Sequence, residues 1–245
     1  MPKHFEFIAA DWPAPANVRA LTTLRAGGTS TGAFASLNLG EHVGDDPGAV
    51  ARNRAILRER LRLPAEPCWL KQVHGTDVIE AGHATGATAD GSFTSMTGTV
   101  CAVLTADCLP VFLCDREGTQ VALLHAGWRG LASGVVEAGT RAMRVHGTEL
   151  LAWLGPAIGP GAYQVGEDVR AAFVAHDPDT AMAFLPDGEG KWLADMYALA
   201  RARLAAAGIT AVFGGGHCTF REHERFFSFR RDGVTGRMAS LIWLE

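Results

Sequence analysis

Three side chains that can bind a metal or carry out nucleophilic chemistry lie at the ends of apolar segments. His74, Cys108 and His125 each lie at the end of a predicted apolar strand, close to a glycine or a proline. Two imidazoles and one thiolate would bind Zn²⁺ and leave a fourth coordination position open, as catalytic zinc sites do. The same ligand set would also accept copper, so the ligand types alone leave the metal undecided.

A predicted hairpin brings two of these residues together. Apolar runs at 109–114 and 120–124 are separated by a five-residue polar segment that contains one glycine. Such spacing is typical of two antiparallel strands joined by a short loop. If the turn centres near Glu117, residues whose numbers sum to about 234 face each other. Cys108 and His125, whose numbers sum to 233, are therefore expected to lie across from one another at the open end.

The same side chains would also support covalent catalysis. Cys108 could act as a thiolate nucleophile, with His125 as its base. The sequence after His125 predicts a helix that runs to about Val145, and its N-terminus could stabilise an oxyanion. Asp107 adjoins Cys108, but strand alternation points its side chain toward the opposite face. The residues alone leave the ligand and nucleophile interpretations of Cys108 both open.

The composition is that of an ordinary globular protein. The chain has 245 residues, of which 48% are hydrophobic and 20% charged, with no internal repeat or low-complexity linker. We therefore predict a single domain that spans residues 1–245. The net charge of −4 disfavours nucleic acid as a partner, because phosphate binding needs a clustered excess of Lys and Arg.

The sequence also predicts a cytoplasmic protein that does not enter a membrane. No window approaches 18 uninterrupted apolar residues, and the first fifteen residues lack the long apolar region of a signal peptide. The five cysteines include no CxxC pair, which indicates reduced thiols.

Further elements follow from periodicity and turn signals. Asp46 and Pro47 predict a helix start, with an N-cap residue and a proline in the first turn. Residues 81–99 are polar and rich in Gly, Thr and Ala, and we predict that they form a loop or a lid over the substrate. Strands are predicted at 18–23, 100–105, 150–154 and 238–244, and helices at 165–176 and 193–207.

Five motifs together resemble the YfiH/YlmD family over nearly the whole chain. They are KQVHG around His74, TADCLP around Cys108, LHAGWRG around His125, SLNLG at 36–40 and FFSFRRDGVTGR at 226–237. Members of this family carry the names laccase-like multicopper polyphenol oxidase, purine nucleoside phosphorylase and peptidoglycan editing factor. The resemblance implies an α/β fold, a single-domain mixed sheet with flanking helices, similar to cytotoxic necrotising factor-like cysteine hydrolases.

The resemblance implies a zinc-dependent purine nucleoside phosphorylase with adenosine deaminase activity. Its substrates would be phosphate and adenosine, inosine, guanosine or methylthioadenosine, and His74, Cys108 and His125 would form the zinc-binding catalytic centre. Both reactions suit an open metal site. Deamination needs an activated water at the purine ring, and phosphorolysis needs a phosphate held against the anomeric carbon.

Substrate-binding residues are expected among the basic and polar residues of the motifs. The family's RxGG motif corresponds to residues 25–28, although Leu24 interrupts the usual Thr-Thr-Arg run that precedes it. Basic groups could hold the phosphate near the metal. The candidates are Arg25, Asn38, Arg129 and Arg230.

Two alternative functions remain from the family names. In a cysteine-dependent amidase that edits peptidoglycan precursors, Cys108 would be the nucleophile and a bound metal would inhibit. In a copper-binding polyphenol oxidase, Cu²⁺ would replace Zn²⁺. A multicopper mechanism fits poorly, because it needs many paired histidines and the chain has nine His and no HxH motif.

Overall fold

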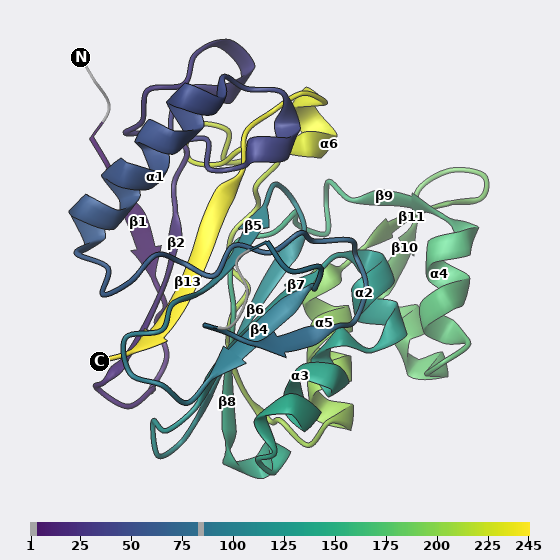
Figure 1. Cartoon of the computed structure of the whole chain (residues 1–245). Helices are drawn as coiled ribbons and strands as arrows, with labels where there is room; N and C mark the ends of the chain where they lie inside the picture. The colour runs from purple at the N-terminus through teal and green to yellow at the C-terminus, as the bar shows by residue number, and fades with distance from the viewer. Residues whose placement is uncertain (1–3, 83–85) are drawn as a thin grey trace.

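A six-stranded mixed sheet runs through the centre of the molecule (Figure 1). The computed structural model describes residues 4–82 and 86–245. The hairpin strands β6 and β7 lie in the middle of this sheet, and every residue of both is buried. Along the sheet the order is β12 (Ala211–Gly214), β8 (Leu150–Leu154), β6 (Leu109–Asp115), β7 (Val121–Ala126), β4 (Gly91–Thr94) and β3 (Val78–Glu80).

A four-stranded antiparallel sheet packs against one face of the central sheet. Phe112 and Trp153 of the central sheet share a buried cluster with Cys101 and Ile242 of the second sheet. The last strand of the chain therefore lies inside the structure, between strands from its beginning and its middle (Figure 1). The order is β1 (Phe7–Ala9), β2 (Val18–Thr23), β13 (Met238–Leu244) and β5 (Cys101–Thr105).

Helices cover the other faces of the two sheets. Leu124 of β7 lies in a buried cluster with Val136 of α3 (Val135–Met143) and Leu199 of α5 (Met196–Ala206). On the outer face of the four-stranded sheet, Leu57 of α1 (Pro47–Leu61) packs with Leu21 and Leu241. The central sheet is thus enclosed on both sides, which explains why β6 and β7 are apolar along their whole length.

Smaller elements complete the fold at its periphery. A three-stranded sheet is built from β10 (Phe184–Pro186), β11 (Lys191–Ala194) and β9 (Gln164–Gly166). Three further helices are α2 (Trp128–Ser133), α4 (Glu167–Val174) and α6 (Phe229–Asp232). The 3₁₀ turns are η1 (Gly32–Phe34), η2 (Glu41–Val43), η3 (Gly147–Glu149) and η4 (Pro178–Ala183).

The hairpin prediction is confirmed, with a shift of register. Pro110 pairs with His125 and Leu109 with Ala126, so facing residue numbers sum to 235. Cys108 therefore lies just beyond the ladder, one step before β6. The loop is set by Asp115, whose carboxylate accepts hydrogen bonds from the backbone N–H groups of Thr119 and Gln120 at 2.7 and 3.0 Å.

The structure corrects the prediction for residues 81–99. Residues 91–94 form β4, which lies between β7 and β3 in the central sheet, and Ala89 and Asp90 are fully buried. The polar composition led to the wrong prediction because the Ser and Thr residues of β4 are buried. Their backbone groups are paired in the ladder between β4 and β7. The part of the loop prediction that falls on residues 83–85 lies outside the described residues.

Other boundaries differ where a turn breaks a continuous pattern. The helix predicted after His125 is divided into α2 and α3 at Gly134, whose φ is 101°. Strands β9 and β11 replace the first residues of two predicted helices, at 165–176 and 193–207. The strand at 100–105 forms, but in the four-stranded sheet.

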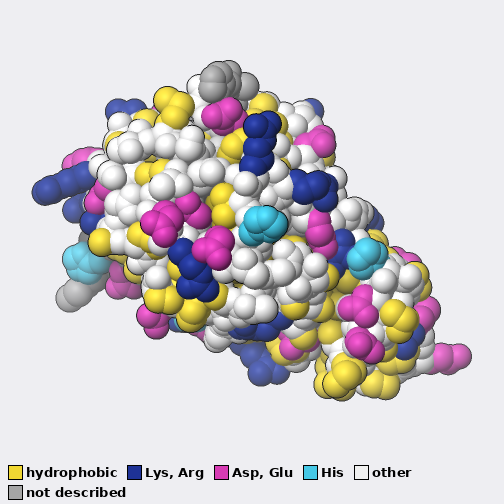
Figure 2. Space-filling model, turned by 90° about the horizontal axis from the view of Figure 1, so that it is seen from below, with side chains coloured by type: hydrophobic (Ala, Val, Ile, Leu, Met, Phe, Trp, Pro, Cys, Tyr) yellow, Lys and Arg dark blue, Asp and Glu magenta, His cyan; other side chains and the backbone are white. Residues whose placement is uncertain are grey.

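Several predicted elements are confirmed. The carboxylate of Asp46 caps α1 by accepting from the N–H groups of Gly48 and Ala49. Strands β2, β8 and β13 begin and end at the predicted residues. Within the described residues, no helix has the length and apolar character needed to cross a bilayer. On the face in Figure 2, acidic and basic side chains are interspersed.

Candidate active site

His74, Cys108 and His125 meet at the end of the β6–β7 hairpin. Their ligand atoms all lie within 4.8 Å of one another, and Cys108 Sγ is 3.8 Å from His74 Nε2. The two imidazole rings stand edge to face, with centroids 4.8 Å apart and an interplanar angle of 74°. His125 is buried, Cys108 partly exposed and His74 exposed, so the group opens to solvent on one side.

A buried carboxylate, that of Asp90, positions both histidines. Its oxygens accept hydrogen bonds from the backbone N–H groups of Val73, His74 and Gly75, at 3.2, 2.8 and 2.6 Å. This clamp holds His74 in a left-handed conformation with φ of 61°. Such a conformation costs free energy and persists only where the surroundings enforce it. Asp90 thereby fixes the bend that carries His74 into the site.

Asp90 also fixes the ring of His125. Its Oδ1 lies 2.8 Å from His125 Nδ1, and its backbone carbonyl accepts from the His125 N–H at 2.6 Å. Because the carboxylate accepts, Nδ1 carries the proton and Nε2 is directed to the centre as a ligand or a base. Sequence reasoning missed Asp90, which lies within the loop or lid predicted at 81–99. One signal was available, because Asp90 is the only Asp, Glu, Lys or Arg in residues 81–99.

Glycines in the GWRG motif allow the chain to pass close to the histidines. A Cβ atom on Gly127 would lie 2.6 Å from His74 Cδ2 and 3.3 Å from Cys108 Sγ. A Cβ atom on Gly130 would lie 2.7 Å from the carbonyl oxygen of Gly75. The first turn of α2 can therefore pack against the site only without side chains at these positions.

The charges of the site favour a thiolate beside an imidazolium in the metal-free protein. Burial by itself raises the pKa of Cys108, but the charge and hydrogen bonding of His125 and His74 outweigh it and lower that pKa to about 6. Burial acts to lower the pKa of His125, and the opposing effects of Cys108 and Asp90 raise it to about 9. For Asp90, burial is outweighed by its hydrogen bonds to His125 and Gly75, which lower its pKa.

Two cavities, each of about 240 Å³, share the wall formed by His74, Cys108, Ala106 and Phe229. We call the first the aromatic cavity, because Trp128 and Tyr163 line it together with Phe229. Its other lining residues are Asp107, Gly127, Arg129, Ile158, Met196 and Arg230. We call the second the polar cavity, and its other lining residues are His42, Gln72, Leu104, Thr105, His125 and Arg237.

Two of the four predicted substrate-binding residues line the aromatic cavity. The guanidinium of Arg129 lies 4.4 Å from the centroid of the Trp128 ring. Arg230 lies over Tyr163 at 5.1 Å and donates from Nη1 to the carbonyl of Gln164 at 2.6 Å. Both side chains are exposed, so each guanidinium can reach a bound molecule.

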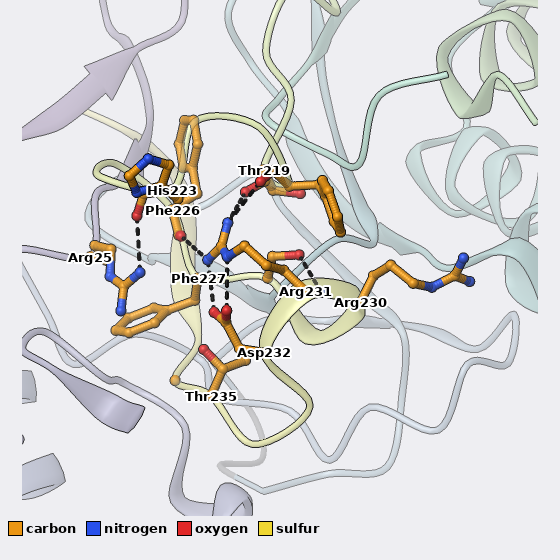
Figure 3. A network of polar contacts seen from close by, with 12 residues as sticks. Arg25, Thr219, His223, Phe226, Phe227, Arg230, Arg231, Asp232 and Thr235 are labelled. Atoms are coloured by element: carbon orange, nitrogen blue, oxygen red, sulfur yellow. Dashed lines mark hydrogen bonds and ion pairs between the residues drawn. The ribbon is translucent and has the colours of Figure 1, made fainter. Parts of the chain in front are cut away.

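The other two lie elsewhere in the structure. Arg25 lines a separate cavity of about 450 Å³ and donates to the carbonyl of Ala35 at 3.2 Å. It also donates to the carbonyl of His223 at 2.9 Å (Figure 3). Asn38 is fully buried, and its side chain bonds Gly40, Asp45 and the backbone N–H of Arg237. The N–H groups of Gly27 and Gly28 in the RxGG motif donate to Ser36 Oγ in the SLNLG motif. The two motifs therefore hold one another in place, and their polar groups do not line the two cavities beside Cys108.

The C-terminal segment 219–232 is fastened over the site by Asp107 and Arg231. Asp107, with φ of 99°, turns away from Cys108 and accepts from Thr219 Oγ1 at 2.6 Å and from the N–H of Arg230 at 2.7 Å. Arg231 donates to the carbonyls of Thr219, Phe220 and Phe226, as Figure 3 shows in part. Asp107 therefore anchors the wall of the aromatic cavity, and Asp90 is the carboxylate that orients His125.

Comparisons with known proteins agree over nearly the whole chain. A family model described as multi-copper polyphenol oxidoreductase laccase matches residues 19–245. A purine nucleoside phosphorylase of Pseudomonas aeruginosa is 55% identical over 240 residues, which cover 98% of either chain. The purine nucleoside phosphorylase YfiH of Escherichia coli is 51% identical over 241 residues, covering 98% of this chain and 99% of the relative.

Solved structures show the same fold. A crystal structure of a Neisseria meningitidis protein has a TM-score of 0.95 at 54% identity, covering 98% of this chain and 99% of that chain. The structure of YlmD from Geobacillus stearothermophilus has a TM-score of 0.90 at 33% identity, covering 95% of this chain and 94% of that chain. The arrangement of sheets described above is therefore shared with these proteins.

Proposed function

This chain belongs to the YfiH family, and we propose that it is a zinc-dependent purine nucleoside phosphorylase that also deaminates adenosine. We further propose that residues 1–245 form one catalytic domain. The observation that carries the proposal is the convergence of His74, Cys108 and His125 between two cavities. Purine nucleoside and phosphate are the substrates that the names of the relatives imply.

The residues present fit a zinc ion. Ligand atoms that share one zinc, with bonds of about 2.0–2.3 Å, stand roughly 3.5 Å apart, and the 3.8 Å between Cys108 Sγ and His74 Nε2 is close to this value. His125 completes an N₂S set, and its other ring nitrogen is held by Asp90, as in other metal sites. When bound, zinc would supply a Lewis acid that activates water or polarises an oxygen.

The aromatic cavity suits a purine base. Trp128, Tyr163 and Phe229 offer rings on which a base can stack, a contact worth about 1–3 kcal/mol per base. Burial and the nearby Cys108 charge raise the pKa of Tyr163 to about 12, so its hydroxyl stays protonated and able to donate. A base placed here would direct its sugar toward the wall at Cys108 that the cavities share.

The contribution of the protein to phosphorolysis would be mainly orientation. The phosphate must approach the anomeric carbon while the base departs, and holding both reactants in place can supply several kcal/mol of the barrier. Arg129 and Arg230 are positioned to bind the nucleoside at the mouth of the aromatic cavity. The buried side of the centre, formed by His125 and Asp90, limits the access of water.

The test is product formation from inosine with and without phosphate, followed by chromatography. We expect hypoxanthine and ribose 1-phosphate only when phosphate is present. Cys108→Ala should lower the rate about 1,000-fold, because a metal Lewis acid contributes several kcal/mol. Cys114→Ala is the matched control, since that thiol is buried near the far end of β6, the strand that Cys108 directly precedes, and should keep activity. Equal rates for the two variants would refute the proposal.

Deamination is tested separately with adenosine in phosphate-free buffer. Conversion of adenosine to inosine by the wild-type protein, and its loss in Cys108→Ala, are the expected results. If adenosine stays unchanged while inosine is still phosphorolysed, the deaminase part of the proposal is wrong and the phosphorylase part stands.

A second candidate is a cysteine amidase acting on peptidoglycan precursors. Three groups that lie in a row in space favour it. Cys108 would be the nucleophile, His125 its base and Asp90 the carboxylate that orients the base. The thiolate would attack the amide carbon, His125 would protonate the departing amine, and water would hydrolyse the thioester. Metal-stripped protein that cleaves a muramoyl-amino-acid amide, and is inhibited by zinc, would establish this alternative.

The polyphenol oxidase name is not supported as a mechanism. Within the described residues, the trio is the only group of three or more side chains with metal-ligand geometry, whereas several coppers need many more ligands. A single copper in place of zinc is chemically possible for an N₂S set. Elemental analysis of the purified protein distinguishes zinc from copper directly.

A further inference from the structure

The polar cavity contains an arginine, Arg237, to which the proposed catalytic centre gives no role. Arg237 ends the FFSFRRDGVTGR motif, directly before β13, and its side chain lines the cavity beside Cys108 and His125. The volume of about 240 Å³ exceeds the roughly 30 Å³ of one water several-fold. A small polyatomic ion would fit beside the trio.

The guanidinium of Arg237 is held in place from behind. Its Nη1 donates to the carbonyls of Thr235 and Gly236, each at 3.0 Å. Its backbone N–H donates to Asn38 Oδ1 at 2.9 Å, which explains the fully buried position of Asn38. Among the described residues, no acceptor bonds the Nε and Nη2 donors of Arg237. This edge of the guanidinium is the one that binds two oxygens of a phosphate or carboxylate.

The surroundings of Arg237 favour an anion. None of the described residues that line the cavity is Asp or Glu, and Arg237 gives it positive charge. Burial, together with the charges of Arg237 and Arg54, lowers the pKa of His42, so this imidazole lines the cavity as a neutral hydrogen-bonding group.

Asp107 is near, but its two oxygens already accept from Thr219 and from the N–H of Arg230. The negative group that lines the cavity is the Cys108 thiolate, whose charge a bound zinc would offset. A negatively charged ligand would then meet the charge of Arg237 without an opposing carboxylate.

An unpartnered hydroxyl gives independent support. Thr105 lines the polar cavity and is only 1% exposed, yet its Oγ1 has no hydrogen-bond partner among the described residues. Buried hydroxyl groups almost always have a partner, so an unpaired one in a cavity wall indicates a ligand or water at that place. The donor and the cation line the same cavity.

We propose that the polar cavity is the site of inorganic phosphate, bound by the free edge of Arg237 with His42 and Thr105. The proposal rests on the proposed phosphorylase function and adds the location of its second substrate. The nucleoside base would occupy the aromatic cavity, and the sugar would lie at the shared wall formed by Cys108 and Phe229. Phosphate and base would then stand on opposite sides of the anomeric carbon, as displacement requires.

The test compares steady-state kinetics of wild type, Arg237→Gln and Arg237→Lys with phosphate and inosine varied separately. Losing a charged hydrogen-bonded pair should raise the KM for phosphate about tenfold or more in Arg237→Gln. Arg237→Lys retains the charge without the planar edge and should show a smaller increase. The KM for inosine should rise much less. Arg60→Gln, on the exposed face of α1, is the control and should match wild type.

Direct binding separates this proposal from the proposed function. Calorimetric titration with inorganic phosphate should show binding to wild type and loss of binding in Arg237→Gln, with thermal unfolding recorded to establish that the variant is folded. If wild type binds phosphate through Arg237 but does not phosphorolyse nucleosides, the proposed function fails and the anion site stands. A folded Arg237→Gln with unchanged phosphate binding overturns the site. So does a phosphate KM that responds to Arg129→Gln and not to Arg237→Gln.

Discussion

At the scale of single residues, the carboxylate of Asp90 joins the two histidines into one unit. It accepts hydrogen bonds from the backbone of residues 73–75 and from the ring of His125. The sequence predicted His74, Cys108 and His125 because imidazoles and thiols at strand ends are chemically distinctive. It did not predict Asp90 or Arg237, since the role of a carboxylate or an arginine depends on contacts with residues far away in the chain.

Asp90→Asn should weaken metal binding without unfolding the protein. The amide keeps the shape but can accept at only one end, so it cannot serve both the N–H groups of residues 73–75 and His125. Loss of such a supporting contact typically costs 10–100-fold in metal affinity. Competition with a chromophoric chelator measures the effect. Asp168→Asn, exposed on α4, is the control and should keep wild-type affinity. An unchanged affinity in Asp90→Asn would show that the clamp is dispensable.

The reactivity of Cys108 in metal-free protein should depend on pH in a characteristic way. The thiolate is the reactive form, so alkylation by iodoacetamide rises as pH increases through the lowered pKa of about 6. The imidazolium partner is lost only when pH rises through the pKa of His125, about 9. We expect half-maximal reactivity near pH 6, against about 8.5 for an ordinary cysteine. A midpoint of 8 or above would contradict the thiolate–imidazolium pair.

At the scale of elements, the hairpin and the first turn of α2 bring the site together. The loop length predicted the hairpin, but the register was one residue off because hydrogen bonds to Asp115 set the turn. The strand β4 was missed because its polar residues give no apolar alternation. Periodicity also does not assign a strand to a sheet, and β5 joins the four-stranded sheet through its pairing with β13.

Gly127→Ala should damage the site and leave the fold intact. The new methyl group would lie 2.6 Å from His74 Cδ2 and 3.3 Å from Cys108 Sγ, so the imidazole must shift from its position in the site. We expect metal affinity and activity to fall at least about tenfold, since displaced ligands lose coordination geometry. Gly216→Ala is the control, because a Cβ atom there meets nothing within 4 Å. Chelator competition and circular dichroism are the measurements, and equal metal affinity in the two variants would refute the packing explanation.

At the scale of the whole molecule, two sheets and their covering helices hold the site at one end of a buried core. The resemblance carried by five motifs predicted the α/β class and the family, because the motifs are distributed along nearly the whole chain. The sequence did not reveal the two cavities. Their walls come from residues as distant as His42, Tyr163 and Arg237, and only the packing of the sheets and of segment 219–232 brings these together.

Zinc should stabilise the folded protein. The ligands come from three separate segments, so only the folded chain presents them together. A free concentration one hundred times the Kd would add about 2.7 kcal/mol, or roughly 5–10 °C in Tm for a domain of this size. Differential scanning calorimetry of stripped and reloaded protein measures the shift. Cys108→Ala should show almost none, and an equal shift in that variant would place the stabilising ion elsewhere.

The central claim is that the His74, Cys108 and His125 centre carries out phosphorolysis with a bound zinc. The most direct measurement is the formation of ribose 1-phosphate from inosine and phosphate by one protein preparation, first stripped of metal and then reloaded with zinc. We predict no product from stripped protein and full recovery of activity at one zinc per chain. Product formed at the same rate without metal, or no product in either state, would contradict the claim.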